Sequence, residues 1–446
     1  PGVAAVVVSV VHLFKGAYAG GKLLERRPVE QITAFLFANG GHDDPKQLAV
    51  NAGKSFVGSY VLGMGFTFDD SGQADEETPG IPSPIATMER LIAEDPKNAE
   101  VIFPYIGGEE VNSSPTHSHH RFVINFGERS EEESLREWPE LMGIVERKVR
   151  GTRGSHSTAP WWQFERPRGE LYSAISDSDR ALVIALTSNS VASASLPLPA
   201  VFSHSLGVFS ISTGAAFSIL QSSTHRFWAF FTGSSMKDDL RYAPSDCFES
   251  FPFPSGFFDV YSEECKQGEN FQGLEMIGTR YKKFRAELLA SNNEGLTSTY
   301  KRFHDPGEPS SGLLELRRLH GEMDQAVIAA YGWSDVPTSC GFGLDYLDTE
   351  DDAQLPDALQ ERIDAGELFF WDADEAINFE SQLRSYEAIK GKKKLPWRYR
   401  WPDDVRDDVL ARLLALNTER YAEEVAQGLH SKGSKKAAKA PAGGGK

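Results

Sequence analysis

The sequence predicts an α+β fold in which a β-rich part is followed by a mainly helical part. Short apolar runs separated by Gly, Pro, Asn and Ser dominate the chain up to about residue 258, as is typical of strands. Beyond that point, apolar residues recur at helical spacing over four long segments. The chain has 446 residues, of which 40% are hydrophobic and 25% charged, a composition that fits a soluble globular protein of two or three domains.

The β-rich part combines strands with short helices. Strands are expected where the sequence is apolar or alternating, at residues 3–14, 32–37, 55–68, 103–106, 122–126, 181–186, 200–202 and 207–211. Helices are expected at residues 85–93, 130–149, 161–175 and 214–231. Ser130 and Glu133 form a capping-box pattern at the start of the second helix, and Pro139 interrupts that helix. Polar loops are expected at residues 69–84 and 112–120.

The later part is expected to be helical at residues 271–291, 310–331, 355–390 and 403–428. Between residues 313 and 331 the apolar side chains follow helical spacing, which predicts a packed bundle. Residues 431–446 contain no large apolar residue and cannot bury a core, so we expect a disordered basic tail there.

The charge of the chain is acidic overall and uneven along the sequence. The net charge of −18 argues against a protein that simply coats DNA, because phosphate contacts require Lys and Arg. Between residues 145 and 241, however, ten Lys and Arg stand against seven Asp and Glu, a local net charge of +3. This distribution allows one basic face on an acidic body, although charge alone favours an ordinary acidic protein whose charges keep it in solution.

The sequence contains no signal for a membrane or for secretion. No run of eighteen apolar residues is present, and the apolar start lacks a basic region and a cleavage site, so we expect a cytoplasmic protein with no membrane segment. Cys247, Cys265 and Cys340 are too scattered for a zinc site or a disulfide framework, and we expect free buried thiols. Residue 1 is Pro and the first methionine is Met64, so we expect further sequence to precede this chain.

Several specific strings carry a resemblance to a known family. FPYIGGEEVNSSPTHSHHRFVINF (103–126), FVGSYVLGMGF (56–66) and SSMKDDLRYAPSDCFESFPFP (234–254) resemble the target recognition region of MmeI-like and DISARM-type adenine DNA methyltransferases. TYKRFHDP, LHGEMDQAVIAAYGW and YRWPDDVRDDVLARLLALN in the later part are similar to segments of the same family. The resemblance therefore covers nearly the whole chain.

The resemblance implies a division of the chain into four parts. These are the trailing edge of a methyltransferase catalytic domain (1–54), a target recognition domain (55–258), a helical C-terminal domain (259–430) and the basic tail (431–446). The NPPY-type tetrapeptide that holds a flipped adenine and a Gly-rich cofactor loop after a strand are both absent from the sequence. We therefore expect no catalytic residue and no cofactor in this chain, whereas the complete enzyme would bind S-adenosylmethionine.

Lys237, Asp239 and Arg241 are the sharpest candidates for contacts to DNA bases. They are spaced by two before Pro244, which predicts three side chains on one face of a single strand. Lys and Arg can donate to guanine, and Asp can accept from cytosine. By resemblance, this KxDxR pattern matches the segment in which the family carries sequence-reading residues, and Ser235 is predicted to contact DNA from the same string. The alternative is a surface strand with a salt-linked ladder of these side chains.

The His-rich loop supplies a second set of candidates. Asn112, Ser114 and Arg121 lie in or beside a polar loop between two expected strands, from which donors can reach phosphates or base edges. An architectural role suits the same loop, because Glu109 and Glu110 can fix its conformation. A metal site is disfavoured, since the adjacent His119 and His120 would point to opposite sides and no Cys lies near.

Arg166 and Arg168 complete the predicted DNA contacts. They follow Trp161 and Trp162, and aromatic faces beside guanidinium groups can stack on bases or clamp a backbone. A packed Trp pair with solvated arginines is the stronger alternative. Serine and histidine near residue 223 lack the GxSxG surroundings of a nucleophile, so we expect capping and packing there.

Together these observations predict the DNA-recognition module of an S-adenosylmethionine-dependent adenine-N6 DNA methyltransferase, in a restriction-modification or phage-defence system. Its expected partners are double-stranded DNA and a methyltransferase catalytic domain or subunit. The alternative is a protein-interaction or scaffold module of a defence complex that does not read bases.

Overall fold

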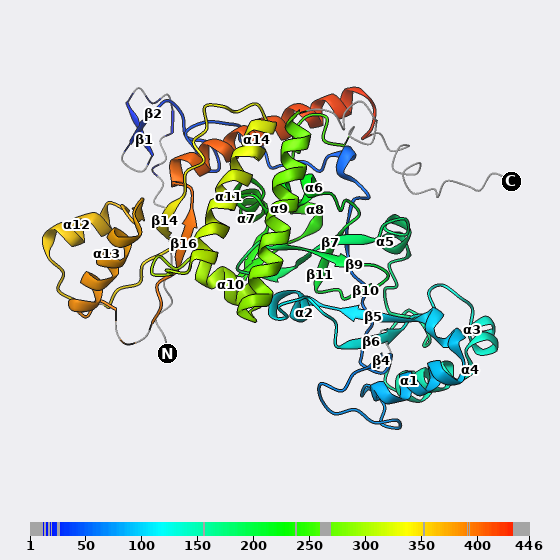
Figure 1. Cartoon of the computed structure of the whole chain (residues 1–446). Coiled ribbons are helices and arrows are strands. Elements are labelled where there is room, and N and C mark those ends of the chain that lie inside the picture. Colours follow the sequence, from blue (N-terminus) through cyan, green and yellow to red (C-terminus); the bar gives the residue numbers. More distant parts are fainter. Residues whose placement is uncertain are drawn as a thin grey trace.

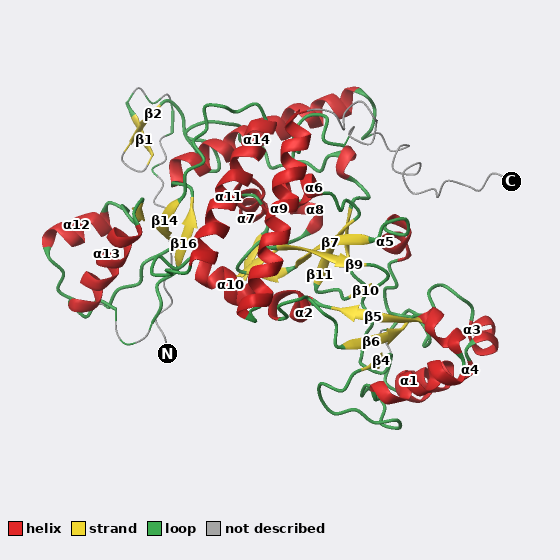
Figure 2. Cartoon of the chain, viewed as in Figure 1, coloured by secondary structure: helices red, strands yellow, loops and turns green. Residues whose placement is uncertain are grey.

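The computed structural model confirms the α+β class (Figures 1 and 2). It describes residues 12, 15–16, 18, 20–24, 27–154, 157–236, 239–258, 269–350, 353–389, 391 and 393–430. The expected strand at 3–14, apart from His12, and the expected tail at 431–446 lie outside the described residues. None of the described helices is long and apolar enough to cross a membrane.

A small lobe, at the lower right of Figure 1, forms around a four-stranded sheet with the order β10-β5-β6-β4. Its strands are β4 (Thr67–Phe68), β5 (Ile102–Ile106), β6 (Arg121–Ile124) and β10 (Val201–Phe202). The helices packed with it are α1 (Ile85–Glu94), η2 (Pro96–Val101), α3 (Glu131–Glu137), α4 (Pro139–Val145) and the π-helical turn η3 (Glu146–Arg150). Phe66, Phe126 and Leu141 are fully buried in its core.

The central region holds the largest core of the described chain. Its antiparallel sheet has the order β3-β11-β7-β9, from β3 (Ser55–Val57), β7 (Arg180–Ala185), β9 (Ser193–Pro197) and β11 (Leu206–Phe209). Its helices include α6 (Gly214–Gln221), α7 (Ser223–Thr232), α9 (Glu269–Asn292), α10 (Leu296–Phe303), α11 (Ser311–Ala330) and α14 (Asp403–Ala426). One hydrophobic cluster runs from Phe37 to Leu414 and crosses residue 258, because α6 packs along α9. The expected domain limits remain predictions.

A second lobe, residues 345–389 with the strands beside it, lies at the left of Figure 1. Its sheet has the order β15-β14-β16, from β14 (Gly341–Leu344), β15 (Phe369–Phe370) and β16 (Trp397–Arg400). Two helices, α12 (Asp357–Asp364) and α13 (Ala373–Ser385), pack onto it around Phe370, Phe379 and Trp397. The expectation of helix throughout 355–390 is wrong at β15, where two adjacent phenylalanines pair with β14.

The remaining elements are short. They are β1 (Lys22–Leu24), β2 (Arg27–Val29), η1 (Ala49–Asn51), α2 (Gly108–Ser113), α5 (Gly169–Ala174), β8 (Thr187–Ser188), β12 (Ser234–Met236), β13 (Asp239–Arg241) and α8 (Pro244–Cys247). Residues 46–51, called the strap below, are bound by α14. The Asn417 side chain accepts the N–H of Lys46 at 2.9 Å and donates to its carbonyl at 2.8 Å, and buried Glu424 accepts the N–H of Ala49 at 2.8 Å.

Local side-chain chemistry explains which expected elements formed. The prediction that Ser130 caps helix α3 is confirmed, since its hydroxyl accepts the N–H of Glu133, and α3 ends just before Pro139 begins α4. The expected strand at 32–37 is wrong, because the Thr33 hydroxyl accepts the N–H of Phe37 at 3.1 Å and closes a turn. The expected helix at 214–231 is broken at Ser222, whose side chain caps α7.

Candidate nucleic-acid interface

A groove of about 1060 Å³ opens beside the central sheet and is lined by parts of α2, the segment before α5 and the end of β13. It brings together four of the nine residues predicted to contact DNA, namely Asn112, Arg166, Arg168 and Arg241. These residues are far apart in the sequence, and the fold places them around one opening. We call this opening the arginine groove.

Two of the three arginines in the groove have free side chains. Among the described residues, the exposed guanidinium groups of Arg166 and Arg241 have no hydrogen-bond or carboxylate partner. Arg168 lies 3.7 Å from Glu170, and its Nε has no hydrogen-bond partner. In the described part of the lining, Glu109 is the acidic residue. Cations without carboxylates beside them retain their full attraction for an anionic ligand.

The backbone around Arg166 and Arg168 holds these side chains at the groove. Arg166 forms an isolated β-bridge with Tyr60, with both N–H···O distances at 3.1 Å. The Ser59 hydroxyl donates to the carbonyl of Pro167 at 2.9 Å. Arg168 has a φ of +62°, a left-handed conformation that a residue with a side chain rarely adopts. This conformation makes the expectation of a helix at 161–175 wrong for its first part, since α5 begins only at Gly169.

Arg121 is bound inside the small lobe. Its guanidinium donates to Glu110 at 2.7 and 3.1 Å and lies 4.9 Å from the ring centre of Tyr105. Glu110 is 2% exposed, and it also accepts the N–H of Gly107 at 2.9 Å, so one carboxylate caps α2 and holds β6. The architectural alternative for Glu110 therefore describes the contacts present, and a DNA contact by Arg121 remains a prediction.

Ser114 and His117 shape the chain after α2. The Ser114 hydroxyl accepts the N–H of Ser118 at 3.2 Å, and its carbonyl accepts the N–H of His117 at 3.3 Å. His117 has a φ of +55°, and burial, aided by the positive charge of Arg285, lowers its pKa to about 4. A neutral imidazole is therefore packed under the loop near pH 7.

The expectation of Lys237, Asp239 and Arg241 on one strand face is wrong. β12 ends at Met236 and pairs antiparallel with β13, which begins at Asp239, so no strand that the structure describes contains all three residues. Asp239 and Arg241 share β13, whereas Lys237 lies outside the described residues. Ser235 pairs with Leu240 through the backbone. Spacing by two does not reveal where a strand begins, and for that reason the sequence misled here.

The groove also contains residues that the sequence did not single out. Tyr60 and His204 form an edge-to-face ring pair with centres 4.7 Å apart, and burial lowers the pKa of His204. Thr187 joins from β8, and Thr297 joins from α10. Tyr60 lies in one of the family-like strings, but only the pairing of distant segments places the other three here.

Other clusters of reactive side chains are packed inside the protein. The Ser223 hydroxyl lies 3.2 Å from Nε2 of His320, and Asp324 lies 3.7 Å from that same nitrogen. All three side chains are buried, and the serine and the carboxylate meet one ring nitrogen instead of opposite ones, which is unlike a nucleophile relay. Within the described chain, no group of three or more His, Cys, Asp or Glu residues could hold a metal ion.

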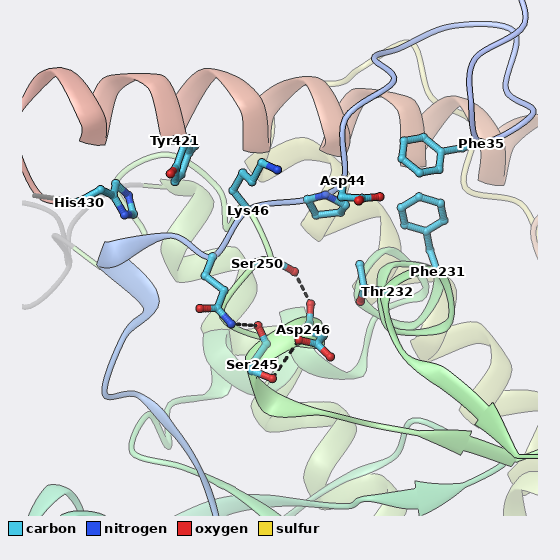
Figure 3. A pocket seen from close by; sticks show the side chains of 12 residues that line it. Phe35, Asp44, Lys46, Phe231, Thr232, Ser245, Asp246, Ser250, Tyr421 and His430 are labelled. Atoms are coloured by element: carbon cyan, nitrogen blue, oxygen red, sulfur yellow. Dashed lines mark hydrogen bonds between the residues drawn. The ribbon is translucent and has the colours of Figure 1, made fainter. Parts of the chain in front are cut away.

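A second hollow, of about 590 Å³, lies between the strap, α7 and α14 (Figure 3). Its wall contains the ring pair of Phe35 and Phe231, with centres 5.1 Å apart. Asp44 and Asp246 offset Lys46 there, so the hollow has no excess of cations. It is a weaker candidate for an anionic ligand than the arginine groove.

Fold and groove together define an α+β protein with an open groove lined by arginines, a surface suited to an extended anion. Residues 85–255 match the family model described as MmeI, target recognition domain, which confirms for this segment the resemblance seen in the sequence. Among solved structures, the chain is similar to the type IIL restriction-modification enzyme MmeI in complex with DNA, with a TM-score of 0.45 and 19% identity. That likeness covers 69% of this chain and 37% of the MmeI chain. No curated protein matched the chain.

Proposed function

We propose that this chain is the DNA-sequence recognition module of a restriction-modification or phage-defence enzyme, and that the arginine groove contacts the DNA. The observation that carries the proposal is the match of residues 85–255 to a target recognition domain. Asn112, Arg166, Arg168 and Arg241 all lie within the matched segment and all line one groove. Half or more of protein–DNA hydrogen bonds go to phosphates and sugars, and Arg166 and Arg241, which have no carboxylate partner among the described residues, suit that role.

The finer parts of the proposal rest on the resemblance of the sequence strings. The complete enzyme would transfer a methyl group from S-adenosylmethionine to N6 of adenine, with the catalytic domain in sequence outside this chain or in a separate subunit. The chain would act in the cytoplasm. Within it, the groove arginines would position the duplex, and β13 with Asp239 and Arg241 would bring side chains to base edges.

Selection from a randomised duplex pool tests the proposal. The chain should enrich a motif, alone or together with the polypeptide encoded upstream. Replacing Arg166, Arg168 and Arg241 by Ala should cost about 2 to 4 kcal/mol of binding free energy, or roughly 30- to 1,000-fold in Kd. The matched control replaces Arg90, Arg136 and Arg318, which are exposed, paired with carboxylates and outside the groove.

The control removes the same charge outside the groove, so it should change Kd by less than about threefold. It should also keep the fold, because exposed ion pairs contribute little to stability. Equal losses in both variants would indicate a general charge effect and contradict a DNA site in the groove. Absence of any enriched motif, with and without the upstream polypeptide, would favour the interaction-module alternative.

A further inference from the structure

The C-terminal end of α2 touches the N-terminal end of α10 at the edge of the arginine groove. The two helices pack together in Figure 1, and each contributes to the groove, Asn112 from α2 and Thr297 from α10. Gly295, the N-cap of α10, lies at their contact and is buried. Gly295 and Thr297 both lie beyond residue 255, where the match to the target recognition domain ends.

Space, and not backbone conformation, requires glycine at position 295. Its φ of −82° is open to any residue. A Cβ added there would lie 2.4 Å from the carbonyl oxygen of Asn112 and 2.5 Å from the carbonyl carbon of Ser113. Both are backbone atoms, so no side chain can turn away to relieve the collision, and one of the two helices must move.

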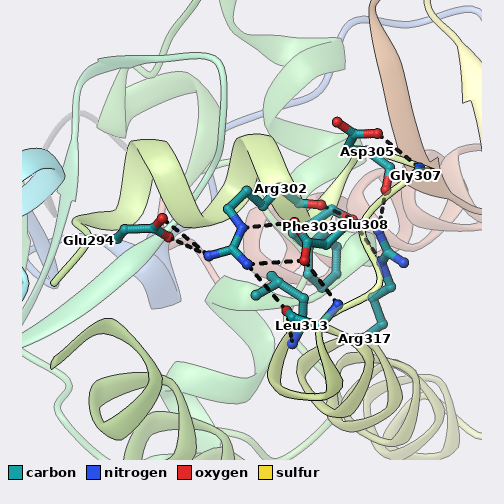
Figure 4. A network of polar contacts seen from close by, with 9 residues as sticks. Glu294, Arg302, Phe303, Asp305, Gly307, Glu308, Leu313 and Arg317 are labelled. Atoms are coloured by element: carbon teal, nitrogen blue, oxygen red, sulfur yellow. Dashed lines mark hydrogen bonds and ion pairs between the residues drawn. The ribbon is translucent and has the colours of Figure 1, made fainter. Parts of the chain in front are cut away.

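α10 is the helix that is held in place (Figure 4). Arg302 bridges Glu294 at 3.0 Å and Glu308 at 2.8 Å, and these contacts tie the start of α10 to the loop after it. The same pairing lowers the pKa of Glu308 to about 2. Arg317 of α11 donates to the carbonyl of Phe303 at 2.9 Å and so holds the other end. Leu296 and Phe303 are buried in the central core.

The C-terminal end of α2 is held less firmly. Glu110 fixes the beginning of this six-residue helix, but Ser113 is exposed and leads into a loop in which Thr116 and residues 118–120 are exposed and the side chain of His117 packs beneath. A side chain at position 295 would therefore displace Asn112 and its neighbours rather than α10. Because Asn112 lines the groove, this displacement would change the site itself.

We propose that the N-terminal end of α10 belongs to the DNA-recognition site, with Gly295 as a positioning residue for Asn112 and Thr297 as part of the groove wall. This inference rests on the proposed function of the groove. It extends the recognition unit beyond residues 85–255. Transfer of that segment alone into a related protein would leave its groove without this wall.

The experiment compares the full chain with Gly295→Ala, Thr297→Ala and the control Gly321→Ala. Gly321 lies in α11, and a Cβ there would meet no atom within 4 Å. Gly295→Ala should lose about tenfold or more in affinity for the selected motif, with little change for random duplex, because displaced contacts reduce specific binding first. Thr297→Ala adds no atom, so it should keep the fold, and it should lower the affinity for the selected motif about threefold. Gly321→Ala should match the wild-type chain.

Hydrogen exchange of residues 107–120 provides a readout without DNA and should be faster in Gly295→Ala than in Gly321→Ala. Unchanged motif affinity in both Gly295→Ala and Thr297→Ala, with a wild-type chain that selects a motif, would overturn the inference and leave the proposed function intact. If the wild-type chain selects no motif, the proposed function fails. In that case, unchanged hydrogen exchange of residues 107–120 in Gly295→Ala also overturns the positioning role of Gly295, whereas faster exchange supports that role.

Discussion

The arginine groove and the residues 345–389 carry opposite charge in one molecule. Among the residues that the structure describes, three arginines and one glutamate line the groove. Residues 345–389 contain 14 Asp and Glu and two Arg, a net charge of −12 within a chain of −18. Both of those arginines are engaged internally, since Arg362 stacks on Phe370 at 4.3 Å and Arg384 pairs with Glu380 at 2.6 Å. We call this region the acidic lobe.

This difference shows that the net charge of the whole chain does not predict the charge of the surface that binds a ligand. Residues 345–389 hold a net charge of −12, part of which Lys393 and Arg398 offset by pairing with Asp348 and Asp345, whereas the described residues that line the groove have a positive balance. Surface charges are screened beyond about 8 Å at physiological ionic strength, so the acidic lobe has little influence on a ligand bound elsewhere. A chain with a net charge of −18 can therefore still present a site for DNA.

Removing one buried carboxylate beside the groove and one from the acidic lobe tests the difference most strongly. Glu110→Ala should lower the free energy of unfolding by about 3 to 5 kcal/mol, because it leaves Arg121 partly buried and unpaired. Glu380→Ala in the acidic lobe should cost about 1 to 2 kcal/mol, since Arg384 keeps its bonds to the carbonyls of Gly391 and Lys393 while the indole N–H of Trp397 loses its acceptor. Urea denaturation of both variants measures the two losses. Equal losses would show that the two regions are built alike.

Lowering the pH should reduce the stability of the folded chain through protonation of His117, in the loop beside the groove. Its pKa is about 4 in the folded chain and about 6.5 when unfolded, so the unfolded chain binds more protons between these values. Stability is unaffected above pH 6.5 and falls as the pH drops toward 4. Asparagine tolerates the left-handed backbone at this position. Between pH 7 and 5, the free energy of unfolding of His117→Asn should therefore fall by about 1 to 2 kcal/mol less than that of the wild-type chain.

Urea midpoints at the two pH values give this difference. His225, whose pKa burial lowers to about 3, contributes equally in both chains, so it cancels from the comparison. The same pH dependence in both chains would remove His117 as the titrating group.

Neutralising the acidic lobe should have the smallest effect on DNA binding. Six exposed carboxylates there have no cationic partner among the described residues: Asp357, Glu361, Glu367, Asp374, Glu375 and Glu387. Their replacement by amides should change Kd for the selected DNA by less than about threefold because of screening. The single change Glu109→Gln in the groove should increase affinity by about threefold or more. A larger gain from the six distant changes would contradict the separation of the two regions.

The sequence predicted elements whose signals are local, and it missed those that depend on distant partners. The cap at Ser130 and the break at Pro139 need only neighbouring residues, and both were predicted. β15 is two residues long and exists because β14 lies beside it, so no pattern within it could reveal it. Likewise, Arg166 and Arg241 were chosen from their strings, but the groove that joins them depends on pairing between Tyr60 and Arg166.

The strap at residues 46–51 has a consequence for how the protein is made. Its partner Asn417 follows Lys46 by 371 residues, and Glu424 follows Ala49 by 375. At a synthesis rate of roughly 5 to 20 residues per second, the ribosome needs about 20 to 75 s to supply them. Residues 248–251 emerge earlier, and they can accept the N–H of Leu48 and the side-chain amide of Asn51 during that interval. The contacts of Lys46 and Ala49 with α14 can form only near the end of synthesis, so the strap is completed in two stages.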